Sequence, residues 1–122
     1  MKKTGILMLN VLAGAGLYAC VSAAALAHAH PVSFSPAADT VVSTPGVIRI
    51  AYDKPLEPAS NIVITGEHEE PVDAGKTVID AQDPSSMSVS LPPLPAAVYI
   101  VKWSAGSSDG HTNKGSYKFT VK

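Results

Sequence analysis

The sequence predicts an all-β domain of about seven strands, arranged as a sandwich or a Greek-key barrel. Short runs of β-branched and aromatic residues alternate between apolar and polar side chains, which is typical of strands with one buried face. Clusters of Pro, Gly, Asp and Ser separate these runs at intervals of about 8–12 residues. Ten prolines in 122 residues disfavour helices, and no helical periodicity is sustained after residue 27.

The expected strands follow one another from residue 32 to residue 121. They are residues 32–34, 47–52 (VIRIAY), 61–65 (NIVIT), 77–79, 86–91 (SMSVSL), 97–104 (AVYIVKWS) and 116–121 (SYKFTV). In the run 97–104, Tyr99, Val101 and Trp103 share one face, which we expect to lie in the core. Between the third and fourth strands, residues 66–76 (GEHEEPVDAGK) form a polar, charged loop.

Residues 1–27 are interpreted as a secretory signal peptide. Two lysines precede a charge-free apolar run over residues 5–24, and Ala25-Leu26-Ala27 is a small-x-small cleavage site. Three alternatives remain open: an uncleaved membrane anchor, cleavage after Ala29, and lipidation at Cys20.

Cleavage after Ala27 leaves a mature domain of residues 28–122. This domain carries seven Lys and Arg against ten Asp and Glu, a net charge of −3, and it contains no cysteine. The negative charge argues against nucleic acid or an anionic membrane surface as a partner. The domain must fold without disulfides in an oxidising compartment, and we expect a soluble, monomeric product.

Four side chains in the mature domain are the candidates for binding a metal. His28 and His30 become the first and third residues, and the segment SSDGHTNKG supplies Asp109 and His111 between the last two strands. If the N-terminal segment lies beside that loop, imidazoles, a carboxylate and a free α-amine converge. An N-terminal histidine chelates a metal through its amine and Nδ1, with a second imidazole opposite. Three nitrogens and one oxygen in a tetragonal field suit Cu(II) better than Zn²⁺ or Ca²⁺.

Simpler interpretations of these residues stay open. The Asp-x-His triplet is a weak signal alone, because Asp109-Gly110 is also a common turn dipeptide. His-x-His at a free N-terminus binds Cu(II) through its amine, two amides and the His30 imidazole, without any fold. His68, within EHEE, is expected in a solvated loop, and Met87 is expected to be a half-buried strand residue rather than a ligand.

The chain resembles the CopC family of periplasmic copper-binding and copper-resistance proteins. The segments that carry the resemblance are HAHPVSFSPA, VIRIAYDKPLE and LPAAVYIVKWSAGSSDGHTNKGSYKFTV. The resemblance implies an Ig-like or cupredoxin-like β-sandwich that binds one Cu(II) through His28, Asp109 and His111, with His30 as an additional ligand. It places His28 at the family's N-terminal histidine, which favours cleavage after Ala27. Some members bind Cu(I) in a methionine-rich loop, but the corresponding segment here, TGEHEEPVDAGK, contains no methionine.

The expected function is that of a periplasmic Cu(II) carrier or buffer that delivers copper to a separately encoded inner-membrane transporter. The first alternative is a monooxygenase-like enzyme that activates oxygen at a histidine brace. Asp109 as a fourth ligand would fill a position that oxygen chemistry needs open, so we expect no enzyme. The second alternative is a structural sandwich module without a metal.

Overall fold

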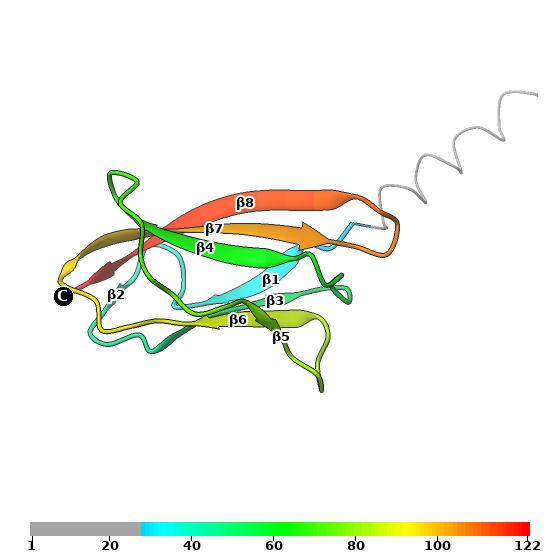
Figure 1. Ribbon diagram of the computed structural model, residues 1–122, viewed down its shortest axis with the longest axis horizontal. Coiled ribbons are helices and arrows are strands. Elements are labelled where there is room, and N and C mark those ends of the chain that lie inside the picture. The colour runs from blue at the N-terminus through cyan, green and yellow to red at the C-terminus, as the bar shows by residue number, and fades with distance from the viewer. Residues whose placement is uncertain (1–27) are drawn as a thin grey trace, which may run out of the picture.

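The chain forms a two-layer β-sandwich (Figure 1) in a computed structural model that describes residues 28–122. The predicted signal peptide and Cys20 lie outside the described residues. The strands are β1 (Pro31–Ser35), β2 (Val41–Val42), β3 (Val47–Tyr52), β4 (Asn61–Gly66), β5 (Val78–Ile79), β6 (Ser86–Ser90), β7 (Ala97–Gly106) and β8 (Thr112–Val121). The predicted all-β sandwich is therefore confirmed. Over the described range, no helix is long and apolar enough to cross a membrane.

Each layer is a four-stranded sheet. One has the order β1-β3-β6-β5, and the other has the order β2-β8-β7-β4. The longest pairing is the β7–β8 hairpin, which runs from Ala97 opposite Val121 to Gly106 opposite Thr112. The expectation of about seven strands lacked β2, a two-residue strand that pairs in parallel with the end of β8. β5 is equally short but was expected from its β-branched residues; the comparable β-branched run at residues 40–42 was not recognised as a strand.

The core lies between the sheets, where the alternating apolar positions of facing strands meet. The largest fully buried apolar side chains are Phe119, Ile48, Ile50, Met87, Val89 and Val101. Tyr99, Val101 and Trp103 are buried as predicted. Met87 was expected to be half-buried, but it is fully buried because β6 is an interior strand of its sheet.

Trp103 packs across the hairpin onto a glycine. It stands opposite Gly115 on β8, and a Cβ at Gly115 would overlap the Trp103 indole. The Tyr52 ring of the other sheet makes a T-shaped contact with the same indole, with ring centroids 5.7 Å apart. This packing fixes the hairpin against β3 just before its closing loop, residues 107–111. The loop lies at the same end of the sandwich as the residues that enter β1 (Figure 1).

Candidate metal centre

The residues before β1 are held to the body of the domain by three contacts. The Ala29 side chain is fully buried, and the Ala29 carbonyl accepts a hydrogen bond from Asn113 Nδ2 at 3.0 Å. The His30 backbone N–H donates to Asp53 Oδ1 at 2.8 Å, and the Asp53 N–H donates to the His30 carbonyl at 3.0 Å. These contacts hold His28 at the end of the sandwich where the β7–β8 loop closes.

The β7–β8 loop is a tight turn that fixes the Asp109 carboxylate. The Ser107 N–H donates to the His111 carbonyl at 3.0 Å, and the Gly110 N–H donates to the Ser107 carbonyl at 3.0 Å. Gly110 has a φ of +87°, a conformation that glycine adopts without strain. Asp109 Oδ1 accepts both the buried Ser107 hydroxyl, at 2.6 Å, and the His111 N–H, at 2.9 Å. With Oδ1 engaged inside the turn, Oδ2 points outward.

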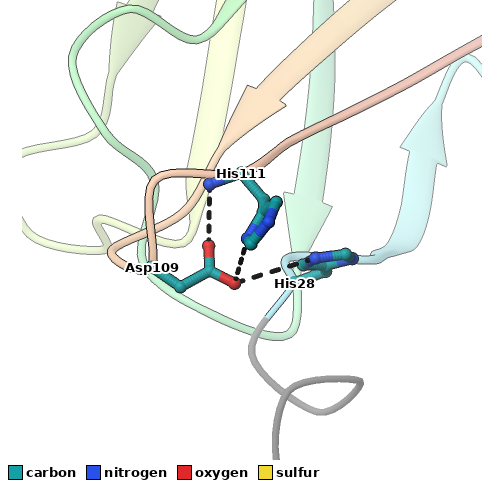
Figure 2. Close-up of side chains that lie close together, drawn as sticks. All are labelled: His28, Asp109 and His111. Carbon is teal, nitrogen blue, oxygen red and sulfur yellow. Dashed lines mark hydrogen bonds and ion pairs between the residues drawn. The ribbon is translucent and has the colours of Figure 1, made fainter. Parts of the chain in front are cut away.

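His28, Asp109 and His111 meet around this second oxygen (Figure 2). Asp109 Oδ2 lies 2.9 Å from His111 Nδ1 and 3.7 Å from His28 Nε2. The two imidazole ring centroids are 4.9 Å apart. One ligand atom from each residue can be chosen so that all three lie within 4.8 Å of one another. Two imidazoles and one carboxylate this close together form a donor set that a single metal ion can bridge.

The Asp109 carboxylate is ionised in this setting. The Ser107 hydroxyl and then the His111 backbone N–H, both donating to it, hold the pKa of Asp109 well below its usual range. An ionised carboxylate offers lone pairs and a negative charge to a cation. The side chains remain accessible, with 39% of His28 and 65% of His111 exposed.

The two other histidines of residues 28–122, His30 and His68, lie outside this cluster. The His30 ring faces Asp53, with Nδ1 3.7 Å from Oδ2, and its centroid is 6.5 Å from that of His28. The His30 backbone N–H lowers the pKa of Asp53. His68 lies in an exposed turn beside Glu67, as expected. The role of His30 as a fourth ligand stays a prediction.

Sequence reasoning missed three residues that position the cluster. Ser107 orients Asp109, while Asn113 and Asp53 hold the N-terminal segment. A serine two residues before the aspartate is a recognisable turn signal, since short polar side chains cap such loops. Asn113 and Asp53 carry no comparable local signal, because their partners lie far away in the sequence.

Comparison with known proteins identifies the family. Residues 31–122 match the CopC domain. The chain belongs to the CopC family. The match includes Asp109 and His111 and begins just after the segment that holds His28 and His30. The resemblance inferred from the sequence is therefore confirmed.

Individual CopC relatives cover most of the chain. Copper resistance protein C of Escherichia coli is 36% identical over 126 residues, which cover 96% of this chain and 98% of that protein. CopC from Methylosinus trichosporium OB3b has a TM-score of 0.72 at 33% identity, covering 78% of this chain and 94% of the other. PcoC from Escherichia coli, a methionine-rich copper resistance protein, has a TM-score of 0.67 at 38% identity, covering 79% of this chain and all of PcoC.

Proposed function

We propose that this protein is a periplasmic Cu(II)-binding protein of copper homeostasis and resistance, which holds one Cu(II) per chain in the cluster of His28, Asp109 and His111. The observation that carries the proposal is that His28 meets Asp109 and His111 around one carboxylate oxygen, although His28 lies about 80 residues before them in the sequence. Relatives named for copper resistance support the choice of metal.

Cleavage after Ala27 would complete the donor set. It converts the His28 backbone nitrogen into a primary amine, which titrates near 8 and gives up its proton to a metal readily. The amine and the Nδ1 atom of His28 could then form a chelate ring with the metal. In the structure Nε2, not Nδ1, faces Asp109, so chelation requires the His28 ring to rotate. The His111 imidazole supplies the third nitrogen and Asp109 an oxygen, a set that suits tetragonal Cu(II).

The composition of the mature domain favours Cu(II) over Cu(I). Soft thiolate and thioether ligands select Cu(I). Residues 28–122 contain no cysteine and one methionine, Met87, whose side chain is fully buried in the core. We therefore propose a single Cu(II) site and no methionine-based Cu(I) site.

The accessibility of the cluster favours a carrier or buffer over an enzyme. Both imidazoles are open to solvent, so an incoming protein ligand could replace them one at a time. We propose that a monomer of this protein passes copper to a separately encoded inner-membrane transporter. Oxidation of a polysaccharide by the copper-loaded protein, given a reductant and oxygen, would contradict this assignment.

The proposal is tested on protein exported with its own residues 1–27 and purified from the periplasm. Intact mass identifies the first residue, expected to be His28, and metal analysis should give one copper per chain. His111→Ala should weaken Cu(II) binding more than about 100-fold, because losing a ligand exceeds the 10- to 100-fold cost of losing an outer-shell partner. One extra residue before His28 should be equally damaging, since the amine becomes an amide.

Matched variants make this test specific. His68→Ala removes a histidine that is 85% exposed and distant from the cluster, so it should leave copper affinity unchanged. His30→Ala should have a smaller effect than His111→Ala. Copper should raise the melting temperature of the parent, because a ligand that binds only the native state stabilises it. Parental affinity, spectrum and thermal shift in His111→Ala would refute the proposed site.

A further inference from the structure

Asp53 fastens the N-terminal segment to the end of β3. Its carboxylate accepts the His30 N–H at 2.8 Å, and its own N–H donates to the His30 carbonyl at 3.0 Å. The backbone bond lies one step beyond the last β1–β3 pair, Pro31 opposite Tyr52, and the side-chain oxygen of Asp53 accepts the other bond. Asp53 therefore holds the His30 backbone at both its N–H and its carbonyl oxygen.

This contact opposes a competing way to bind copper. A free His-Ala-His terminus can surround Cu(II) with its amine, two deprotonated amide nitrogens and the imidazole of His30. In that square, the metal takes the place of the amide hydrogens. The His30 amide hydrogen points at Asp53 Oδ1, 2.8 Å from the nitrogen, so the carboxylate oxygen stands where a copper–nitrogen bond would form. The square and the hydrogen bond exclude each other.

Ala29 adds a second obstacle to the square. Its side chain is fully buried, and its carbonyl is held by Asn113 on β8. Wrapping residues 28–30 around one ion would change the backbone conformation at Ala29, and the burial of its side chain and the bond from Asn113 resist that change. The fold therefore opposes the tripeptide square at two consecutive residues.

We propose that Asp53 is a positioning residue that selects the copper-binding mode of the N-terminus. By holding the His30 amide, it blocks the tripeptide square and leaves His28 free to join Asp109 and His111. This inference rests on the proposed Cu(II) function and adds a determinant outside the ligand set. Binding is thereby confined to a mode that needs the folded domain, because Asp109 and His111 belong to the β7–β8 loop.

The experiment compares Asp53 variants of the exported protein, each loaded with one equivalent of Cu(II) at neutral pH. Visible absorption and electron paramagnetic resonance separate the two modes, because deprotonated amides are strong-field donors that move the d–d band to shorter wavelength. Asp53→Ala should raise the ratio of square to cluster form about tenfold or more, the effect of losing a hydrogen bond to a charged acceptor. Asp53→Asn keeps an oxygen acceptor and should stay close to the parent.

The control is Asp80→Ala. Asp80 also accepts a backbone N–H, from Gln82 at 2.9 Å, and its side chain is 35% exposed against 40% for Asp53. Asp80→Ala should leave the copper spectrum unchanged. Adding His30→Ala to Asp53→Ala should abolish the new band, because the square loses its fourth nitrogen. A band that persists in this double variant would overturn the proposal.

The remaining outcomes separate this inference from the proposed function. A folded Asp53→Ala protein with the parental spectrum overturns the role of Asp53 and leaves the cluster intact. An amide-type spectrum already present in the parent, and retained in His111→Ala, overturns the proposed function and with it the role of Asp53. If Asp53→Ala fails to fold, Asp53→Leu takes its place, because it keeps the branched shape of the side chain and also lacks the acceptor oxygen. A parental spectrum in that variant would also count against the proposal.

Discussion

Met87, the one methionine of residues 28–122, provides a quantitative test of whether this side chain packs in the core or binds copper. Its side chain is fully buried on β6, where it stands opposite Ile50 on one side and Ile79 on the other. Met87→Ala leaves a cavity between the sheets, and such truncations cost about 2–5 kcal/mol. In a domain of this size, 1 kcal/mol corresponds to about 4–8 °C. The melting temperature should therefore fall by about 10 °C or more.

The assay is thermal unfolding of the metal-free protein, followed by circular dichroism, together with Cu(II) and Cu(I) titrations against a competing chelator. Met87→Leu nearly conserves volume and should cost less than about 1.5 kcal/mol. It should leave Cu(II) binding unchanged. A Met87→Ala protein that melts within about 2 °C of the parent would refute the packing argument. If the parent binds Cu(I) tightly and Met87→Leu abolishes this binding, Met87 is a copper ligand and the assignment to the core alone is refuted. If tight Cu(I) binding survives Met87→Leu, the expected lack of a Cu(I) site is contradicted.

Three further predictions follow from the hairpin and its loop. Ser107→Ala removes the hydroxyl that orients Asp109 and should weaken Cu(II) binding about 10- to 100-fold, measured by chelator competition. The fold lowers the pKa of Asp109 below its ordinary value of 3.8, so the ionised carboxylate stabilises the native state at any pH above 3.8. This stabilisation is lost as the pH falls from 3.8 toward the lower pKa of the folded protein. Melting temperatures of the metal-free protein should therefore depend less on pH between about 5 and 2 in Asp109→Asn than in the parent. Gly115→Ala places a methyl group against the Trp103 indole and should lower the melting temperature and change the tryptophan fluorescence; an unchanged emission spectrum would contradict that packing.

The strands could be predicted from the sequence because each of the longer ones has one buried face. In β7, the alternation of Tyr99, Val101 and Trp103 follows directly from the period of two, and these side chains are buried. β2 was missed although its β-branched run resembles the one that predicted the equally short β5; its parallel pairing with the end of β8 is visible only in the fold. The full burial of Met87 likewise depends on the place of β6 inside its sheet.

Only part of the candidate site could be predicted from the sequence. The Asp-x-His triplet marks the loop between the last two strands, and the predicted signal-peptide boundary marks His28. Their approach depends on how the two sheets stack, which no local pattern encodes. The contacts of Asp53 and Asn113 depend on the same stacking and on strand register, so these two residues could be found only in three dimensions.

In the proposed site, copper would have a mechanical role in the domain. His28 precedes β1 in one sheet, whereas Asp109 and His111 lie on the loop between two strands of the other. An ion held by all three would cross-link the two sheets and close a loop of about 80 residues in the chain, as a disulfide does in other proteins. Unlike a disulfide, this cross-link opens when the cargo leaves. Handing over copper would then free His28 alone, because Asn113 and Asp53 hold Ala29 and His30 without the metal. A partner could distinguish loaded from empty protein by how firmly His28 is held.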